Sequence, residues 1–417
     1  MRALVVMVLP AVLFLPTVQG NDWPQYNGPG FDRKIGGEFP VRDWEKQPPR
    51  EVWTVGTSGG FSSYVTGDGR VYAIGKSGGD EQLMARDAGT GQERWSLKLG
   101  PARYDGGGDT GAEGNRGGDG PRSTPVFHKG GVFAYDAHMN VHAVRADTGK
   151  IVWKHSIPEE FGGKVIKWQN ASAPIVLDDK VIVGGGGKGQ AFLVFDRTSG
   201  KVVWKSGEGT ITHATPTVAT IHGKLQVLFF MHEGVVAVDP GNGTELWRYP
   251  FPFRVATAAS PVVWDDIVSV AAGYGVGGGA CRVSRSGDSW EAKEIWRVKG
   301  SGKVANIWST PVCVDGYMYG MFSAKKWGDG PLKCVDIRTG EVKWEENGFG
   351  QGHVSVAGGK LLALTDYGEL AVVDPDPGGY KELTRAMVLE GKCWSTPVFA
   401  NDRLYLRSTT HGRCLRP

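Results

Sequence analysis

Residues 85–95 read Ala85-Arg86-Asp87-Ala88-Gly89-Thr90-Gly91-Gln92-Glu93-Arg94-Trp95, and the rest of the chain repeats this pattern. In general form the pattern is A-x-D-x-x-T-G-x-x-x-W. It recurs with changes in stretches that end at Trp153, Trp204, Trp247 and Trp344, and more weakly at Trp296. Self-similarity at a spacing of about 20 to 50 residues is typical of solenoids, propellers and repeat arrays. The repeat therefore decides the fold class before any local feature does.

Each unit combines a tight turn with strand-like sequence. Asp87 can accept hydrogen bonds from the backbone N–H groups just ahead of it, and Gly91 supplies the positive φ that a tight hairpin needs. A large flat indole at a fixed distance after each turn suits a wedge against the neighbouring unit. We therefore predict a structural docking role for seven tryptophans: Trp53, Trp95, Trp153, Trp204, Trp247, Trp296 and Trp344.

The units open with a second recognisable strand, which carries a Ser-x-Pro or Ser-Pro sequence, as at Ser123-Thr124-Pro125. Proline at the first position of a strand loses no ladder hydrogen bond. Residues 50–55 resemble the end of a unit whose beginning is missing, whereas residues 395–415 begin a unit that never reaches its tryptophan. Pairing these two halves would close a ring and cover its edge strands.

Counting the units gives eight blades. The seventh unit keeps Val372-Val373-Asp374 and has Leu383 near the place of the tryptophan, and the fifth unit lacks the standard turn around Tyr274–Gly279. No helical periodicity is evident after residue 20. We predict an all-β, eight-bladed β-propeller with four-stranded blades, closed by N- and C-terminal strands that share one blade.

The first twenty residues read as a cleavable secretory signal peptide. Arg2 forms the charged start, Leu4 to Leu15 the apolar core, and Val18-Gln19-Gly20 the cleavage region. The apolar run is too short to span a bilayer. We expect an exported protein, periplasmic or extracellular, in which residues 21–49 form an irregular lead-in and residues 50–417 form the propeller.

Composition narrows the partners. The formal net charge of +3 and the lack of a long basic run do not favour nucleic acid. Five cysteines lie apart without a Cys-x-x-Cys pair, so an odd thiol remains in any pairing. Cys334 and Cys414 take strand positions at which neighbouring repeats carry alanine or valine, which predicts buried thiols. A closed propeller of this kind is expected to be a monomer.

The repeated A-x-D-x-x-T-G-x-x-x-W motif with Ser-x-Pro strands resembles the tryptophan-docking repeat of PQQ-like (pyrroloquinoline-quinone-like) eight-bladed propellers. The resemblance covers nearly the whole chain after residue 20 and is best at 85–95, 237–247 and 334–344. Asp22-Trp23-Pro24-Gln25 is similar to the start of secreted PQQ-like proteins of planctomycete type. The family includes quinoprotein alcohol dehydrogenases and the BamB-like propeller of outer-membrane-protein assembly, so the fold alone does not fix the function.

The resemblance implies a test for dehydrogenase chemistry. Quinoprotein dehydrogenases hold their quinone between a tryptophan and a disulfide of two adjacent cysteines, with calcium and a catalytic aspartate nearby. This chain has no Cys-Cys dipeptide and no Cys-x-x-Cys-His haem segment. No position maps to the calcium ligands or to the aspartate, so the catalytic residues stay unknown, no metal site is predicted, and PQQ with calcium stays an open alternative.

Residues just before the opening strands should surround one mouth of the central channel. Polar side chains with indoles beside them could hold a planar or anionic ligand there, or could only bind neighbouring backbone and water. The candidate residues are Arg122, Asn170, His213, Asn306, Trp308, His353 and Trp394.

Two other features are weaker. The glycine-rich insertion from Tyr104 to Pro121 is either a binding element or a solvated linker. His138 and His142 would adjoin on a helix, but on a strand they only share a face, which disfavours a metal pair.

The sequence therefore leaves three functions open. The favoured one is a non-catalytic binding or scaffold protein with protein partners in the cell envelope. The alternative is a PQQ-dependent alcohol or sugar oxidoreductase with a modified site. A third reading is a small molecule or polysaccharide bound at the aromatic rim.

Overall fold

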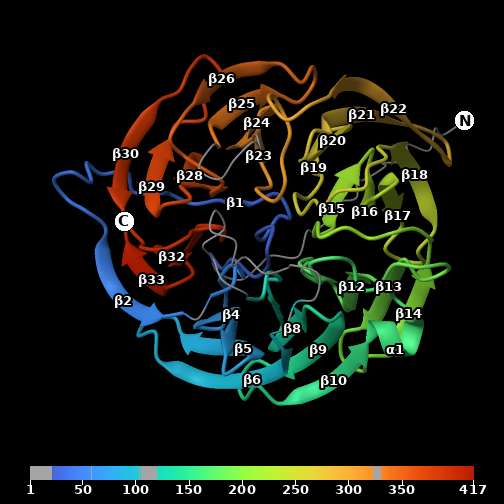
Figure 1. Ribbon diagram of the computed structural model, residues 1–417, viewed down its shortest axis with the longest axis horizontal. Coiled ribbons are helices and arrows are strands. Elements are labelled where there is room, and N and C mark those ends of the chain that lie inside the picture. The colour runs from blue at the N-terminus through green and yellow to red at the C-terminus, as the bar shows by residue number, and fades with distance from the viewer. Residues whose placement is uncertain (1–20, 58, 103, 105–119, 323–329) are drawn as a thin grey trace, which may run out of the picture.

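The computed structural model describes residues 21–57, 59–102, 104, 120–322 and 330–417. Eight sheets stand around a central axis and form a closed ring, with the chain running once around it (Figure 1). The predicted eight-bladed propeller is confirmed. Within the described residues no helix has the length and apolar character needed to cross a membrane, and the expected signal peptide lies outside these residues.

The blades follow the chain, each from its inner to its outer strand (Figure 1). Blade 1 comprises β3 (Val65–Gly67), β4 (Arg70–Ser77), β5 (Asp80–Asp87) and β6 (Glu93–Pro101), and blade 2 comprises β7 (Val126–His128), β8 (Gly131–Tyr135), β9 (Asn140–Arg145) and β10 (Ile151–Ser156). Blade 3 comprises β11 (Ile175–Leu177), β12 (Lys180–Gly184), β13 (Phe192–Asp196) and β14 (Val202–Ser206). Blade 4 comprises β15 (Thr217–Ile221), β16 (Lys224–Met231), β17 (Gly234–Val238) and β18 (Glu245–Pro250).

Blades 5 to 7 have the same order. Blade 5 comprises β19 (Val262–Trp264), β20 (Ile267–Ala272), β21 (Gly277–Ser286) and β22 (Ser289–Val298). Blade 6 comprises β23 (Val312–Val314), β24 (Tyr317–Met321), β25 (Leu332–Asp336) and β26 (Val342–Glu346). Blade 7 comprises β27 (His353–Ala357), β28 (Lys360–Leu364), β29 (Glu369–Val373) and β30 (Glu382–Met387).

Blade 8 closes the ring. Its inner strands are β31 (Val398–Ala400), β32 (Arg403–Arg407) and β33 (His411–Arg416), and its outer strand is β2 (Arg50–Gly56) from the other end of the chain. β2 pairs antiparallel with β33. The buried Arg407 donates to the carbonyls of Ser62, Ile74 and Gly59 at 2.8–2.9 Å. The shared blade is thus confirmed, and a buried guanidinium joins it to blade 1.

At six of the seven tryptophans the indole N–H bonds a carbonyl of the next blade. The indole N–H of Trp95 donates to the carbonyl of Ala146 in the turn of the next blade at 2.9 Å. The equivalent bond recurs at the other five: Trp53 to Ala88, Trp153 to Arg197, Trp204 to Pro240, Trp296 to Ile337 and Trp344 to Asp376. The turn itself forms as predicted, because Asp87 accepts from the backbone N–H groups of Gly89 and Thr90.

Trp247 is the exception. It packs with the residues of blade 5, but its indole N–H donates to the side chain of Gln226 in its own blade at 2.7 Å. The next blade is the one that lacks the standard turn, since β21 and β22 form a long hairpin there. Without that turn there is no carbonyl at the usual place, so the bond is made within the blade.

Blade 7 has no docking tryptophan of its own. In the other blades the tryptophan stands opposite the residue just before a β-bulge, as Trp95 stands opposite Ala85. In blade 7 that position is held by Thr384, opposite Val372, so Leu383 is one residue away from the tryptophan's place. The missing indole is replaced by Trp44 from the lead-in, which is buried in the cluster that blades 7 and 8 share.

The lead-in is part of the core. Trp23 and Trp44 are buried, and the short strand β1 (Lys34–Ile35) adds in parallel to β27 on the inner side of blade 7. One short helix interrupts the strands, because α1 (Ile157–Phe161) follows β10. Pro158 starts this single turn and Gly162 ends it in the left-handed conformation.

Candidate functional site

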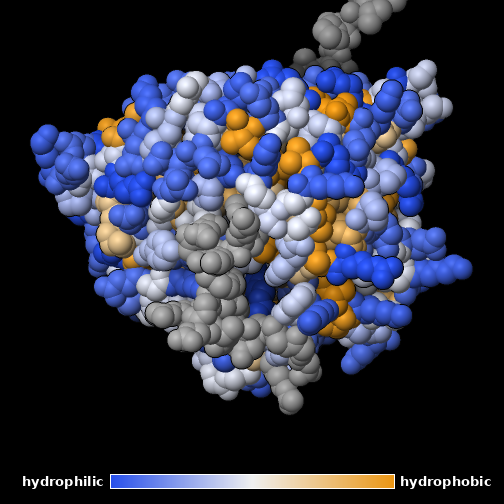
Figure 2. All heavy atoms as spheres, turned by 45° about the horizontal axis from the view of Figure 1, so that its top comes forward, coloured by the Kyte–Doolittle hydropathy of each residue, from blue (hydrophilic) through white to orange (hydrophobic). Residues whose placement is uncertain are grey.

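The inner strands of the blades begin at one mouth of the channel. Figure 2 shows a narrow, hydrophilic opening near the middle of its view of the molecule. Six of the seven candidate residues precede these strands, and His353 is the first residue of β27. Three of the seven support the fold, and the other four belong to two groups of contacting side chains.

Asn170 and Asn306 support the fold. The amide nitrogen of Asn170 donates to the carbonyls of Tyr135, Asp136 and Ser172, and its oxygen accepts from the backbone N–H of Ser172. Asn306 donates to the carbonyls of Ser309 and Met321. Both side chains are buried, so the backbone groups at the blade starts form hydrogen bonds with these amides instead of with water. Neither amide faces a ligand.

His353 is the first residue of β27 and is 3% exposed. Burial, together with the nearby charge of Arg33, holds its pKa well below the ordinary value, so the ring is neutral. Arg33 comes from the lead-in and donates to the carbonyl of Val354 and to the hydroxyl of Thr396. Arg33 could not be found from the sequence, because the lead-in has no repeat against which to align it.

An aromatic cluster formed by Phe61, Trp308 and Trp394 occupies one side of the mouth. The ring centroids of Trp308 and Trp394 are 4.7 Å apart, as are those of Phe61 and Trp394. The Lys392 ammonium lies 4.4 Å from the Trp394 ring centroid. The Trp394 indole N–H donates to Asp366, and burial raises the pKa of that carboxyl. Trp394 thus contacts an aromatic ring on two sides.

A basic and aromatic group lies beside it. The backbone N–H of Phe61 donates to Pro121, the residue before Arg122. The Arg122 guanidinium lies 5.0 Å from the Tyr104 ring centroid and donates to the carbonyl of Trp168. His213 contacts the carbonyl of Lys167, and burial followed by the charge of Arg122 lowers its pKa to about 4. This histidine is therefore neutral at pH 7.

Sequence reasoning missed Glu81, which lies behind Tyr104. Its carboxylate accepts from the Tyr104 hydroxyl at 2.7 Å and from the backbone N–H of Ala137 at 3.0 Å. Burial raises its pKa to about 7, against the effect of these two bonds. The sequence does not single out Glu81, because it lies near the start of β5, the strand before the docking turn. At that position it resembles an ordinary polar strand residue.

The two histidines at 138 and 142 do not form a metal pair. His142 is buried and bonds Asp136 at 2.9 Å, whereas the ring of His138 contacts the carbonyl of Pro101. Across the described parts of the chain, no three His, Cys, Asp or Glu side chains come together as a metal site. The structure does describe all five cysteines, and each is buried as a free thiol. The glycine-rich insertion lies mostly outside the described residues.

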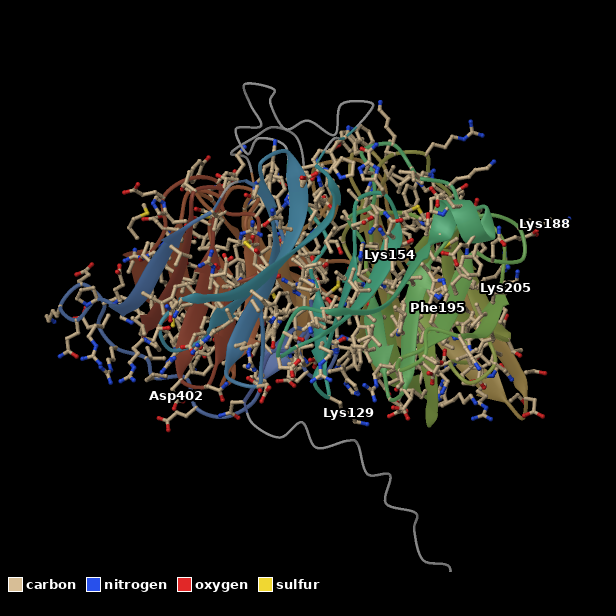
Figure 3. The ribbon with its side chains drawn as sticks, turned by 90° about the horizontal axis from the view of Figure 1, so that it is seen from below. Lys129, Lys154, Lys188, Phe195, Lys205 and Asp402 are labelled. Atoms are coloured by element: carbon tan, nitrogen blue, oxygen red, sulfur yellow. The ribbon has the colours of Figure 1, made fainter. Side chains whose placement is uncertain are left out.

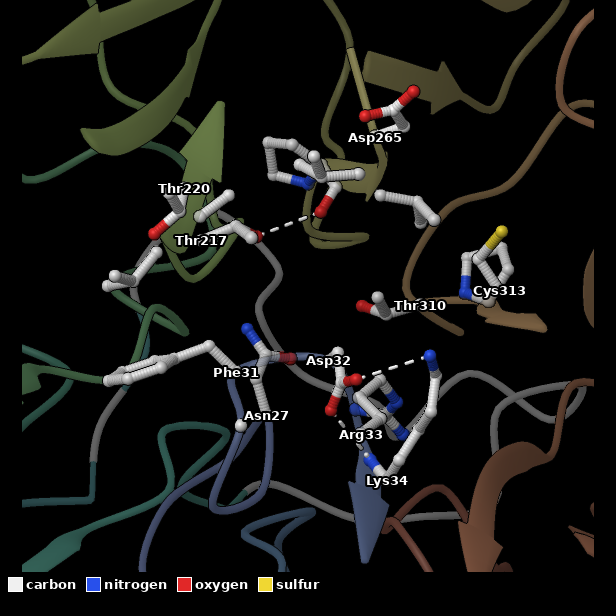
Figure 4. Close-up of a pocket in the computed structure, with 17 residues that line it drawn as sticks. Asn27, Phe31, Asp32, Arg33, Lys34, Thr217, Thr220, Asp265, Thr310 and Cys313 are labelled. Carbon is white, nitrogen blue, oxygen red and sulfur yellow. Dashed lines mark hydrogen bonds and ion pairs between the residues drawn. The ribbon is translucent and has the colours of Figure 1, made fainter. Parts of the chain in front are cut away.

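A second hollow of about 220 Å³ lies between the lead-in and the inner strands of blades 4, 5 and 6. Asn27, Asp32 and Lys34 from the lead-in face Thr217 and Thr310 across it (Figure 4). Lys34 pairs with Asp32 at 3.2 Å, and Thr217 donates to the carbonyl of Pro261. Lys34 and Asp32 thus neutralise each other at the hollow.

The residues at the mouth do not fit a flat quinone between an indole and a disulfide. Trp394 is covered by Phe61 and Trp308, and the neighbouring Cys393 is a buried free thiol that contacts the carbonyl of Gly391. A planar ring could stack on Trp394 only after these aromatic rings separate. No step through such a cofactor follows from this arrangement.

The ring of eight antiparallel blades, the repeated tryptophans and the shared closing blade define a PQQ-like repeat β-propeller. The chain belongs to the family described as outer membrane protein assembly factor BamB, whose model matches residues 79–316 and 328–414.

Curated relatives are distant. The chain is 23% identical to the outer membrane protein assembly factor BamB of Shewanella oneidensis, over 68% of this chain and 71% of the relative. It is 25% identical to BamB of Burkholderia pseudomallei, over 87% of this chain and 86% of the relative. It is also 27% identical to the quinoprotein ethanol dehydrogenase of Pseudomonas putida, over 73% of this chain and 52% of that enzyme.

Solved structures share the fold. The quinohemoprotein alcohol dehydrogenase of Comamonas testosteroni superposes with a TM-score of 0.67 at 15% identity, over 95% of this chain and 80% of the other. The computationally designed Ika8 protein superposes with a TM-score of 0.58 at 14% identity, over 88% of this chain and all of that chain. At such identities the likeness concerns the fold alone.

Proposed function

We propose that this chain is an exported, non-catalytic binding protein of the cell envelope, with other envelope proteins as its partners. The observation that carries the proposal is the state of the channel mouth. Trp394 lies against Trp308 and Phe61, and the polar candidates bond neighbouring backbone. A rigid ring whose mouth is committed to its own contacts offers its outer surface and edges for binding.

The comparisons support the same direction. Two relatives that are aligned over at least two thirds of their length are outer membrane protein assembly factors. A location outside the cytoplasm agrees with the signal-like sequence of residues 1–20.

The alternative is a PQQ-dependent alcohol or sugar oxidoreductase with a modified site. It is favoured by the resemblance to the quinoprotein ethanol dehydrogenase and by the aromatic and basic residues at the mouth. It needs Phe61 and Trp308 to move away from Trp394, and a stacking partner other than a disulfide.

Calorimetric titration of the mature protein with PQQ, with and without calcium, separates the two functions. We expect no binding heat and no shift of the melting temperature. Saturable binding that is lost in Arg122→Ala and Trp394→Ala would overturn the non-catalytic proposal, since both residues belong to the mouth. Tyr274→Ala is the matched control, because this exposed aromatic residue lies in the β20–β21 turn.

Partner binding needs its own measurement. Chemical cross-linking in intact cells, followed by purification of the tagged protein, should recover the same envelope protein in repeated experiments. Recovery of no reproducible partner would contradict the proposed function whatever the titration shows.

A further inference from the structure

The outer strands of blades 4, 5 and 7 carry an ion pair on their exposed side. In each, an arginine pairs with a glutamate three residues earlier in the same strand: Arg248 with Glu245, Arg297 with Glu294 and Arg385 with Glu382. In blades 4 and 5 the arginine directly follows the docking tryptophan. The glutamate neutralises the arginine and keeps the side of the strand hydrophilic.

Blades 2 and 3 depart from this pattern in the same way. Their outer strands read Lys150-Ile151-Val152-Trp153-Lys154 and Lys201-Val202-Val203-Trp204-Lys205. Ile151 and Val202 stand where blades 1, 4, 5, 7 and 8 have glutamate, and blade 6 has the half-buried Val342 there. We call these two stretches the lysine–aliphatic strips.

The aliphatic residues of the strips are unusually exposed. The exposed fractions are 50% for Ile151, 53% for Val152, 42% for Val202 and 46% for Val203. Most exposed apolar residues in proteins occur singly and need no explanation, but adjacent ones in neighbouring elements indicate an interaction surface. Two pairs in consecutive blades form such a surface.

The lysines of the strips are not neutralised. Among the described residues, Lys150, Lys154, Lys201 and Lys205 form no ion pair, and all four are exposed. Lys154 and Lys205 both lie on the side wall of the ring (Figure 3). The surface thus combines aliphatic side chains with uncompensated positive charge.

The backbone edge of β14 is open as well. β14 pairs with β13 and is the outermost strand of blade 3 (Figure 1). The edge of β10 is less accessible, because α1 follows it and Glu160 binds both the backbone N–H of Ser156 and the ring of His155. The indole bond from Trp153 to Arg197 ties β10 to blade 3, so the two strips keep a fixed relation.

We propose that β14 binds an extended segment of a partner protein in which acidic and aliphatic residues alternate, with the strip on β10 as a second contact. The segment adds to the free edge of β14 as a fifth strand, its backbone pairing with that edge. Its carboxylates pair with Lys201 and Lys205, and its aliphatic side chains cover Val202 and Val203. This inference rests on the proposed function as a binding protein and names the chemistry of the partner.

The lysines also select the occupant. Lysine on an edge strand opposes pairing with a second copy of the same strand, because like charges meet. An acidic segment converts that repulsion into attraction. If the lysines served only to prevent aggregation, the neighbouring positions would be expected to be polar. They are instead exposed valines and an isoleucine, which indicates a binding surface.

The test uses a synthetic, fluorescently labelled peptide of alternating glutamate and valine, titrated against the full mature protein and followed by fluorescence anisotropy. We expect saturable binding that weakens as salt rises. Val202→Glu, which copies the arrangement of blades 4 and 5 next to Lys205, should weaken binding at least about tenfold, as should Lys205→Glu.

Val342→Glu is the matched control, because Val342 holds the equivalent position two residues before Trp344 in blade 6, where Lys343 and Glu345 flank the tryptophan. It should leave peptide affinity unchanged, and a peptide of alternating lysine and valine should not bind. Circular dichroism and melting temperature establish that each variant is folded.

The outcomes are distinct. Equal peptide affinity of wild type and Val202→Glu would overturn the site, and no binding at about millimolar peptide would overturn the acidic occupant. Self-association of the wild type that Val202→Glu abolishes would identify a second copy as the occupant and also overturn the proposal. Each of these results leaves the proposed function standing if cellular cross-linking still recovers a partner, whereas loss of cross-linking in the wild type refutes that function itself.

Discussion

The backbone N–H of Trp44 donates to the hydroxyl of Thr384 at 2.9 Å, which places an indole from the lead-in beside the one complete blade that lacks its own docking tryptophan. The two residues are 340 positions apart in the chain. Seven tryptophans from the repeats and one from outside them therefore serve the ring.

Removal of this indole should destabilise the whole ring. Trp44 is 2% exposed, and replacing a buried tryptophan with alanine costs about 3–5 kcal/mol. Trp44→Ala should lower the free energy of unfolding by that amount in a denaturant titration, whereas Tyr274→Ala, at a residue that is 59% exposed, should change it little. Equal unfolding midpoints for the two variants would show that Trp44 does not serve blade 7.

The glycine of the docking turn can be tested with a control of the same backbone conformation. Gly91 and Gly223 both have a φ of 72°, but a Cβ on Gly91 would lie 2.8 Å from the Trp53 ring, whereas one on Gly223 would meet nothing within 4 Å. Gly223→Ala should cost about 1–2 kcal/mol, through backbone strain alone. Gly91→Ala should cost about 1–3 kcal/mol more, because it displaces the indole. Similar losses, measured by chemical denaturation, would refute a close turn–indole contact.

Glu81 predicts a specific dependence of stability on pH. Its folded-state pKa of about 7 lies above the ordinary 4.5, so the folded protein keeps a proton that the unfolded chain releases. Its contribution to stability is therefore complete below pH 4.5 and is lost as the pH rises through 7. Relative to Glu81→Gln, the wild type should lose up to about 3 kcal/mol between pH 4.5 and pH 8. Unfolding titrations across this range measure the difference, and the exposed Glu291→Gln should run parallel to the wild type.

The seam between blades 8 and 1 depends on Arg407. Its guanidinium holds three backbone carbonyls and is 1% exposed, so Arg407→Met leaves those carbonyls without their donor. The expected loss is at least about 3 kcal/mol, seen as a lower melting temperature. Arg416→Met changes an exposed arginine of the same blade and should have little effect. If both variants melt alike, the ring does not rely on this seam.

The repeat made most of the fold predictable, because every unit shows the same turn and indole. The limits of the prediction fall where the chain leaves the repeat. Leu383 lies next to the tryptophan's place, held by Thr384, and the sequence could not tell the two apart because a β-bulge shifts the register in a unit that has no tryptophan. The roles of Trp44 and Arg33 were not predictable, since their partners belong to strands more than 300 residues away.

The candidate site was predictable by position only. The repeat places Asn170, Asn306 and His213 before the inner strands, but it cannot say whether a polar side chain turns to the channel or to a carbonyl. The direction depends on which backbone groups nearby lack a hydrogen-bond partner. Both asparagines and the histidine form hydrogen bonds with such backbone groups. Glu81 shows the converse, because its partner Tyr104 belongs to the glycine-rich insertion, which has no counterpart in the repeat.

The pairing of β2 with β33 also governs the order of events during synthesis. A ribosome releases residues 50–56 long before residues 411–416, so the first outer strand has no partner until nearly the entire polypeptide has emerged. Contacts between segments so distant in the chain form slowly, because a long loop must close first. The nascent protein consequently spends most of its assembly as an open arc with unpaired β-strand edges, which is the period in which a chaperone has most to protect.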